Sequence, residues 1–520
     1  MVTSRPGQQG IGFKAPFMEN VSQAHGEFTL QRLRGILRGV EKESLRATPQ
    51  GTLATTVHPS ALGSALTHPR ITTDFSESQV ELITGVHSSV TSCMEELTQI
   101  QQFTTRALGD EILWASSMPC ALPSDDAIPI GQYGTSNVGR SKSVYRTGLG
   151  YRYGRRMQTI SGIHYNWSLP GTSSDAYFGL IRNFRRHAFL LLYLFGASPA
   201  VCSTFVAGRE HQLKSLNQHT MYLPHATSLR MGRLGYQSDA QAALAVSYNS
   251  LQGFLASLQA AMHQSYPPYE AIGVRGPEGD YRQLATSLLQ IENEFYGTIR
   301  PKRVLQSGER PVHALRERGV EYVEVRLLDL DPFETVGIQA QTMRFLDVFL
   351  LHCLCSPSPL DTPAEIIALA RNQHKVAERG REPGLELERG DRQVLLTECA
   401  TELIASLRPI ARQMDLAFAT TDHSAAIDAA TQALSKPDTL PSTRVLRAVM
   451  DQPNGSFVAF VRSQSSHIKQ TMLDMPLPSE VRRHFELLTQ VSLQEQSAIE
   501  TADSVPFDTY LQNYLSVAST

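Results

Sequence analysis

The chain has 520 residues, of which 41% are hydrophobic and 19% are charged, and this composition predicts a folded globular protein with room for more than one domain. The formal net charge is −3, so no overall basic excess indicates a nucleic acid or an anionic membrane as a partner. Six cysteines stand without a CxxC pair or a zinc-ligand spacing. That pattern favours free thiols and a cytoplasmic protein, while leaving an incidental disulfide open.

The sequence shows neither a signal peptide at residues 1–25 nor a stretch apolar enough to span a membrane. Residues 1–25 are polar, contain glycine and lack the apolar core of a signal peptide, so we expect a flexible N-terminal arm. The most apolar stretch, residues 188–201, is too short and too interrupted to span a bilayer. After the arm, the spacing of apolar residues predicts a short helix over residues 28–37 and a β-hairpin over residues 39–56.

Hydrophobic periodicity predicts the remaining elements in chain order. The predicted helices lie at residues 60–66, 90–109, 175–196 and 240–264, and the predicted strands at residues 79–84, 163–168 and 319–329. Residues 119–150 show no such periodicity, and we predict a long irregular loop, a kind of segment that is often functional. From residue 339 to the end of the chain, helical periodicity dominates.

Two glutamates mark the opening strand. Glu41 and Glu43 stand two residues apart, so on a strand their side chains project from one face. Two like charges held side by side repel each other unless water, a cationic side chain or a metal ion lies between them. Taken alone, such a pair is more often a solvated strand edge than a site.

Polar side chains alternate with apolar ones in three further strands, around Glu81, His164 and Glu324. If these strands are neighbours, one face of the sheet is dry and the other is functional. The functional face then carries Glu41, Glu43, Glu81, His164 and Glu324. Four carboxylates and an imidazole on one surface favour a hard divalent cation such as Mg²⁺ or Mn²⁺, which nucleotide phosphates require.

Each of these residues also has a structural alternative. His164 can be a core histidine bonded to a carbonyl, and Glu324 with Arg326 can be a surface ion pair worth under about 1 kcal/mol. The basic turn at residues 300–303 can simply be exposed. The sequence has no GxxxxGK[ST] loop, no GxGxxG fingerprint between a strand and a helix, no GxSxG elbow and no HExxH helix. A bound nucleotide would therefore lie on a metal-bearing sheet rather than on a glycine-rich loop.

Eight sequence blocks in a fixed order carry a more specific signal. They are GVEKESLR at residues 39–46, ITTDF at 71–75, QYGTSN at 132–137, SGIHYN at 161–166, ATSLR at 226–230, QIENE at 290–294, IRPKR at 299–303 and EYVEVR at 321–326. Together they resemble the proteobacterial glutamate–cysteine ligase (gamma-glutamylcysteine synthetase) family over about residues 35–390.

The resemblance implies an α+β fold. Its core would be a curved antiparallel β-sheet funnel similar to that of glutamine synthetase, surrounded by helices. We expect a catalytic ligase domain at residues 26–390 and a helical C-terminal region at residues 391–520 packed on it. We also expect a monomer that acts on small molecules and binds neither nucleic acid nor membrane.

The resemblance also implies a reaction. ATP would phosphorylate the side-chain carboxylate of glutamate, and the amine of cysteine would attack the acyl phosphate to give gamma-glutamylcysteine, ADP and phosphate, the first step of glutathione biosynthesis. Mg²⁺ or Mn²⁺ would be the metal and ATP the co-substrate. No covalent enzyme nucleophile is needed, and no nucleophile motif is found in the sequence.

The resemblance assigns roles residue by residue. Glu41, Glu43, Glu81, His164 and Glu324 resemble metal ligands, and Arg230 with Arg326 resembles the cations that face the transferring phosphoryl group. Asp74, Gln158 and Asn166 resemble substrate contacts, and Phe75, Tyr145 and Tyr236 resemble the pocket for the cysteine side chain. The expected nucleotide contacts are Arg300, Lys302 and Arg303.

Some positions depart from the family pattern. His225 stands where tyrosine is expected, the connection from Pro170 to Tyr177 is short, and the arm and tail differ. These departures leave open a related ligase that uses another acceptor amine, and a non-catalytic relative is a third hypothesis.

Overall fold

The structure is a computed structural model that describes residues 29–235, 239–242, 244, 246–306 and 308–516. The predicted arm at residues 1–25, and Tyr236, lie outside the described residues.

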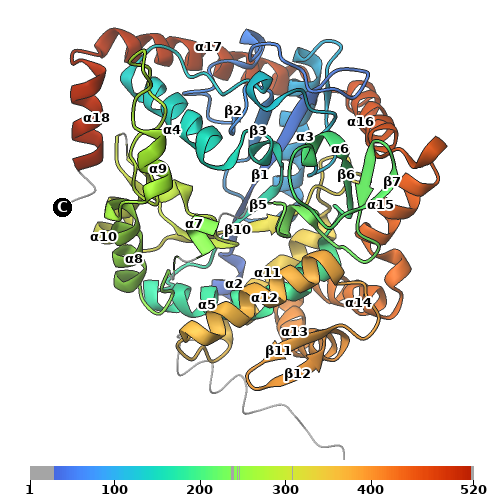
Figure 1. Cartoon of the computed structure of the whole chain (residues 1–520). Coiled ribbons are helices and arrows are strands. Elements are labelled where there is room, and N and C mark those ends of the chain that lie inside the picture. The colour runs from blue at the N-terminus through green and yellow to red at the C-terminus, as the bar shows by residue number, and fades with distance from the viewer. Residues whose placement is uncertain (1–28, 236–238, 243, 245, 307, 517–520) are drawn as a thin grey trace, which may run out of the picture.

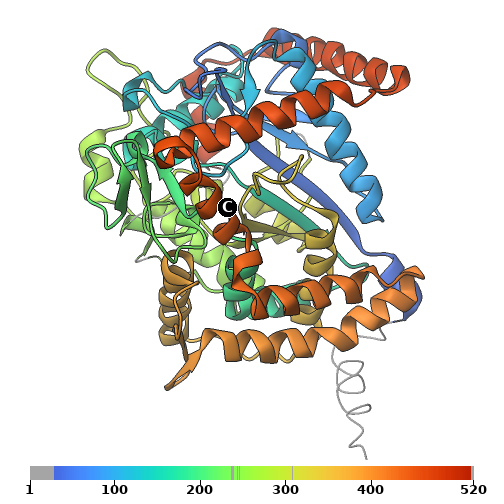
Figure 2. The same cartoon turned by 90° about the vertical axis from the view of Figure 1, so that its right-hand side faces the viewer.

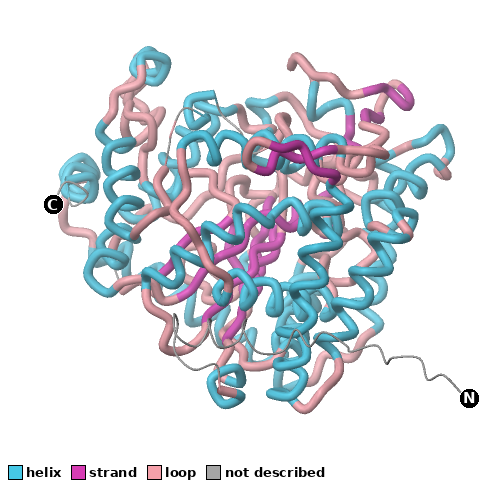
Figure 3. The backbone as a smooth tube through the Cα atoms, turned by 90° about the horizontal axis from the view of Figure 1, so that it is seen from below, coloured by secondary structure: helices cyan, strands magenta, loops and turns pink. Residues whose placement is uncertain are grey.

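An antiparallel sheet forms the centre of the fold, with the strand order β2-β3-β1-β5-β10-β9. Its strands are β1 (Leu37–Ala47), β2 (Ile71–Thr73), β3 (Gln79–Ile83), β5 (Ile163–Ser168), β9 (Ile299–Lys302) and β10 (Tyr322–Leu328), and the short β4 (Ile112–Leu113) pairs with the end of β1. Figure 3 shows these strands at the centre of the molecule with helices around them. The predicted α+β class is therefore confirmed, and the sheet is open rather than a closed barrel.

The helices surround this sheet (Figures 1 and 2). They are α2 (Leu30–Arg34), α3 (Val90–Ala107), α4 (Asn137–Tyr153), α5 (Ser174–Phe195), α6 (Ser203–Val206), α7 (Asp239–Ala242), α8 (Leu251–His263), α9 (Pro267–Ile272), α10 (Pro311–Arg318), α11 (Ala340–Cys355), α12 (Pro363–Arg379), α13 (Leu396–Phe418), α14 (Asp422–Ser435), α15 (Pro441–Met450), α16 (Phe457–Asp474), α17 (Ser479–Ala502) and α18 (Phe507–Ser516). Two small sheets stand apart, β6 (Ala200–Cys202) with β8 (Thr220–Tyr222) and β7 (Lys214–Asn217), and the hairpin of β11 (Glu386–Arg389) with β12 (Arg392–Leu395).

The two faces of the central sheet differ in character because side chains alternate along each strand. Val40, Tyr165, Trp167 and Val325 are fully buried. On the same face, Tyr165 donates from its hydroxyl to Asp347 of α11 over 2.7 Å, so α11 packs there. The opposite face carries Glu41, His164 and Glu324, and it is the face that concerns function.

The C-terminal helices contribute to the same hydrophobic core as the sheet. Met414 of α13, Val461 of α16 and Phe485 of α17 are buried in one cluster with Val40 of β1. In Figure 1, α17 crosses the top of the molecule and α18 lies at its left edge beside α4. Among the described residues, no helix is long and apolar enough to cross a membrane. All six cysteines are free thiols.

The structure corrects the hairpin predicted at residues 39–56. β1 is a central strand that pairs with β3 on one edge and β5 on the other, so neither edge is open to the returning segment. That segment forms one isolated bridge with β1, between Ala47 and Leu53, and Thr56 accepts from the Arg46 guanidinium, but it forms no paired strand.

The structure also corrects the loop predicted at residues 119–150, because α4 begins at Asn137. The Ser136 hydroxyl caps this helix by accepting from the Gly139 amide over 3.2 Å. The helix predicted at residues 240–264 is two described helices, α7 and α8, and the second begins behind a Ser250 cap. The helix predicted at residues 60–66 is a single 3₁₀ turn, Ser60–Leu62.

Candidate active site

Strand register brings the predicted carboxylates together. Glu43 of β1 lies opposite Glu81 of β3, and Glu41 lies opposite His164 of β5. Glu324 of β10 lies on the far side of β5, opposite Asn166. The four strands are therefore neighbours, and their alternating polar residues form one polar face.

His164 is at the centre of this face. Its Nδ1 atom lies 3.1 Å from Glu41 Oε2, and its Nε2 atom lies 3.4 Å from Glu43 Oε1. Asn166 donates from Nδ2 to Glu41 Oε1 over 2.9 Å. Glu43 is almost completely buried, and its second oxygen accepts from the Gly162 amide over 2.7 Å. The imidazole therefore joins two carboxylates that stand two residues apart on one strand.

Cations surround Glu324 on the other side of the face. Lys302 of β9 donates to Glu324 Oε1 over 3.2 Å, and Arg326 donates from Nη1 to Glu324 Oε2 over 3.1 Å. The same Arg326 atom lies 3.5 Å from His164 Nδ1. Burial would raise the pKa of the Glu324 carboxyl, but Lys302 and Arg326 hold that pKa well below its ordinary value.

The residues of this face fit a divalent cation. Ligand atoms of Glu41, His164 and Glu324 lie within 4.8 Å of one another. The Asn166 Oδ1 atom is buried beside them without a hydrogen-bond partner. Burial, together with the charges of Glu41 and Asp74, raises the pKa of Glu81 well above its ordinary value, as expected where negative charges gather without a cation between them. Carboxylate oxygens are the donors that Mg²⁺ and Mn²⁺ prefer.

We expect Mg²⁺ to stabilise the protein increasingly as the pH rises above the ordinary pKa of a glutamate side chain. A raised Glu81 pKa means that the metal-free folded protein holds a proton that the unfolded chain has already lost. Its stability therefore falls as pH rises between the two pKa values, and a cation that displaces this proton restores it. Thermal unfolding with EDTA and with Mg²⁺ across this range measures the effect. The Glu81→Gln variant should flatten the metal-free profile, and an unchanged profile in that variant would contradict the assignment.

Arg230 reaches the site from a short 3₁₀ turn, Leu229–Met231. Its guanidinium donates to the Arg326 carbonyl over 2.8 Å, and the side chain is almost fully buried. Asp329 fixes the turn, because its carboxylate accepts from the hydroxyls of Ser198 (2.7 Å) and Ser228 (3.0 Å). Arg230 and Arg326 are thus neighbours in the structure.

The predicted substrate residues lie at the margin of the polar face. Gln158 donates to the Tyr296 hydroxyl over 2.7 Å. The charge of Asp74, which follows β2, helps to raise the pKa values of both Glu43 and Glu81. Phe75 is buried, and Tyr145 lies on α4. The guanidinium of Arg303, a predicted nucleotide contact, does not point to the polar face. It donates to the Arg318 carbonyl and pairs with Glu321.

Two cavities adjoin this face. The first, which we name the arginine cavity, measures about 280 Å³ and is lined by residues that include Arg185, Arg186, Arg230, Arg326, Gln241 and Tyr296. The second, named the edge cavity, measures about 320 Å³ beside strand β9. Its walls include Phe254, Leu258, Leu315, Arg300, Lys302 and Arg303.

Sequence reasoning missed Gln241 and Tyr296, which line the arginine cavity, and Arg146 of α4. Arg146 donates to the Asp74 carbonyl and stacks over the Tyr133 ring at 4.5 Å. Ser136 caps α4, but a lone serine before a glycine-containing stretch is too weak a signal to reveal the helix and hence Arg146. No periodic or motif signal marks Gln241.

Comparison with known proteins agrees with this geometry. The glutamate–cysteine ligase family model matches residues 21–376. The glutamate–cysteine ligase of Saccharophagus degradans is 45% identical over 502 residues, covering 93% of this chain and 94% of that protein. The enzyme of the same name from Pseudomonas aeruginosa strain LESB58 is 46% identical over 503 residues, covering 93% and 95%.

Solved structures match as well. A crystal structure of glutamate–cysteine ligase from Francisella tularensis in complex with AMP aligns with a TM-score of 0.89 at 36% identity, covering 93% of this chain and 98% of that one. A bifunctional glutathione synthetase from Pasteurella multocida shares the fold at 24% identity, with a TM-score of 0.70 over 91% of this chain and 57% of its own. The chain therefore belongs to the glutamate–cysteine ligase family.

Proposed function

We propose that this chain joins the side-chain carboxylate of L-glutamate to the amine of L-cysteine at the expense of ATP. The observation that carries the proposal is the cluster of Glu41, His164 and Glu324 beside Arg326, on a face where Glu43 and Glu81 stand in register. Such a face suits phosphate groups that approach a carboxylate through shared cations. Family membership supports ATP as the co-substrate, because a relative binds AMP.

The chain's own residues act on charge and position. A carboxylate is a poor electrophile, so the glutamate side chain takes the γ-phosphoryl group and ADP leaves. Arg230 and Arg326 lie where they stabilise negative charge on the phosphoryl group as it moves. The cysteine amine then attacks the acyl carbon, phosphate departs, and an amide remains. Glu41, Glu43, Glu81, His164 and Glu324 would hold a bound Mg²⁺ or Mn²⁺, which would offset the repulsion between the phosphates and the carboxylates of this face.

Side chains near the polar face would orient the reactants. Asn166 donates from its side-chain amide to Glu41, and its buried Oδ1 atom has no hydrogen-bond partner. We place the cysteine side chain near Phe75 and Tyr145, and the substrate backbone near Asp74 and Gln158. Tyr236 keeps its proposed role from the resemblance alone.

We place the nucleotide base in the edge cavity. Phe254, Leu258 and Leu315 offer apolar surface there, and Arg300 and Lys302 stand at the boundary with Glu324. A planar base buried against aliphatic and aromatic side chains, with its phosphates directed to the cations, fits such a pocket. Arg303 lines the same cavity, although its guanidinium turns outward.

Leu305→Asp should raise the KM for ATP about tenfold and leave the KM for glutamate unchanged. Leu305 is half exposed and lines the edge cavity, so the new carboxylate would repel the nucleotide phosphates. Steady-state kinetics with each substrate varied in turn measure the change. Leu416→Asp, at an exposed leucine of α13, is the matched control. Equal KM values for ATP in both variants would move the base elsewhere.

ADP release that requires glutamate, cysteine and Mg²⁺ together tests the function as a whole. The alternative, another acceptor amine, predicts a higher kcat/KM for an amine other than cysteine in a panel of analogues. His225, one of the departures that motivated it, is exposed, and its carbonyl accepts from the Arg381 amide. We retain cysteine as the proposed acceptor.

We propose that residues 26–390 form the catalytic domain and that residues 391–520 form a helical region packed on it. We also propose that the protein is a monomer in the cytoplasm. The common core of sheet and C-terminal helices supports this packing.

A further inference from the structure

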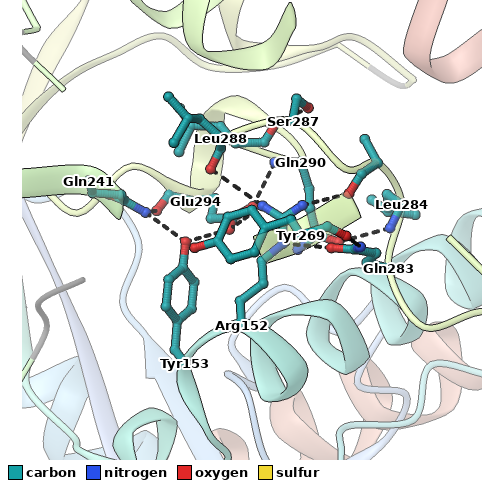
Figure 4. A network of polar contacts seen from close by, with 12 residues as sticks. Arg152, Tyr153, Gln241, Tyr269, Gln283, Leu284, Ser287, Leu288, Gln290 and Glu294 are labelled. Atoms are coloured by element: carbon teal, nitrogen blue, oxygen red, sulfur yellow. Dashed lines mark hydrogen bonds and ion pairs between the residues drawn. The ribbon is translucent and has the colours of Figure 1, made fainter. Parts of the chain in front are cut away.

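A fully buried ion pair lies beside the arginine cavity and has no part in the chemistry described above. Arg152, near the end of α4, donates from Nη1 to Glu294 Oε1 over 2.9 Å, and neither side chain is exposed. The Tyr153 hydroxyl donates to the same oxygen over 2.6 Å. Figure 4 shows Glu294 at the meeting point of these groups. Burying two charges is costly, so a pair of this kind is weak evidence for stability and invites another explanation.

One line of contacts runs from Glu294 back to the middle of α4. Glu294 Oε2 accepts from the main-chain N–H of Gln290 over 2.7 Å. The Gln290 side chain in turn donates to the Tyr145 carbonyl over 3.3 Å. Its amide also packs against Gly148, where a Cβ atom would lie 2.2 Å from Gln290 Oε1. Two hydrogen bonds therefore connect the Glu294 carboxylate to the backbone of Tyr145.

A second line runs from Glu294 to Gln158. Gln241 of α7 donates to the Tyr153 hydroxyl (3.1 Å) and to the Glu294 carbonyl (2.9 Å). The Gln241 oxygen accepts from the Tyr296 amide over 3.0 Å, and the Tyr296 hydroxyl accepts from Gln158. The Tyr153 and Tyr296 rings meet edge to face at 5.6 Å. Gln241 and Tyr296 are themselves walls of the arginine cavity.

Arg152 fixes the network from the other side. Its Nε atom donates to Gln283 over 2.9 Å, and its guanidinium stacks on the Tyr269 ring at 4.1 Å. Glu294 is therefore held by an arginine that is itself held by packing. A carboxylate with this many fixed donors defines the relative position of α4, the 283–296 segment and α7.

We propose that Arg152, Tyr153 and Glu294 are positioning residues for the acceptor amino acid. This inference rests on the proposed function, since Tyr145 and Gln158 are its proposed cysteine and substrate contacts. The two lines of hydrogen bonds hold both residues in the geometry needed for the amine to approach the acyl carbon. Small displacements of Tyr145 and Gln158 would cost binding and rate, so Arg152, Tyr153 and Glu294 would act through these two residues and not by contact with a reactant.

The chain contains a matched control on the opposite face of the sheet. Asp347 of α11 accepts from Arg38 over 3.1 Å and from the Tyr165 hydroxyl over 2.7 Å, and all three side chains are buried. This is again one carboxylate, one arginine and one tyrosine. Tyr153→Phe and Tyr165→Phe each remove one hydroxyl without leaving a charge unpaired, so their costs to folding should be similar.

The experiment compares these two variants with the native protein. Tyr153→Phe should raise the KM for cysteine about fivefold to tenfold and leave the KM for ATP within about twofold. It should also speed amide hydrogen exchange in peptides from α4 and from residues 294–298. Tyr165→Phe should lower the thermal midpoint to a similar degree and change neither the KM for cysteine nor exchange in those peptides.

Equal KM values for cysteine in the two variants, or unchanged exchange at α4 in Tyr153→Phe, would overturn the positioning role. The exchange measurement needs no turnover, so it decides the inference independently of activity. If the native protein releases no ADP with glutamate and cysteine, the proposed function fails. Hydrogen exchange in α4 and in residues 294–298 would still show whether the Glu294 network fixes the wall of the arginine cavity.

Discussion

Replacing Glu324 with glutamine is expected to lower kcat by about a thousandfold or more while the protein stays folded. Glu324 is buried, and it is the one member of the Glu41, His164 and Glu324 cluster that also contacts both Lys302 and Arg326. Glutamine keeps the shape of the side chain but removes its charge. A bound cation would then lose a ligand, and Lys302 and Arg326 would lose the negative charge that they pair with beside the proposed phosphate site.

Kinetics of ADP release, with thermal unfolding as the measure of folding, test this expectation. Glu96→Gln is the matched control, because Glu96 also joins two basic side chains, Arg70 at 2.8 Å and His87 at 2.6 Å, but lies on α3 away from the polar face. It should leave kcat unchanged. Near-native activity of Glu324→Gln would exclude this carboxylate as a metal ligand.

The polar face was predictable from the sequence because alternation in a strand has only two outcomes. Glu41 with Glu43 must share a face, and so must Glu324 with Arg326. Nothing in the alternation says which strands are neighbours, and the order of the eight blocks resolved that by resemblance to a family that the comparisons confirm. The register that sets Glu43 against Glu81 follows only from the folded sheet.

Helix α4 was not predictable because its glycines serve close packing rather than flexibility. A Cβ at Gly139 would lie 2.2 Å from the Tyr133 carbonyl oxygen, and one at Gly148 would collide with Gln290. Close contacts in the folded protein therefore require glycine at these two positions of α4. Because glycine is a poor helix former, the sequence alone does not predict the helix. The Arg152 to Glu294 pair is equally invisible, since its partners are 142 residues apart and each alone resembles a surface charge.

Arg230→Lys is expected to lower kcat about a hundredfold to a thousandfold, with little change in the KM for ATP. The guanidinium lies between the Arg326 carbonyl and the backbone of Gly162, where a Cβ atom would sit 2.1 Å from Nη2. The planar guanidinium therefore occupies the space that a side chain at position 162 would need. A lysine retains the charge but lacks the planar fork of donors that matches the oxygens of a phosphoryl group.

Gly162→Ala tests the same contact from the other side, without touching the arginine. The added methyl group must displace the Arg230 guanidinium, so kcat should fall in this variant as well. Because the two changes remove one interaction, the double variant should be little slower than Arg230→Lys alone. Additive losses would show that Gly162 acts instead through the hydrogen bond that its main-chain N–H donates to the Glu43 carboxylate. Rapid-quench measurement of the first turnover identifies the step, since a fall confined to phosphoryl transfer is the signature of a cation that acts on the moving phosphate.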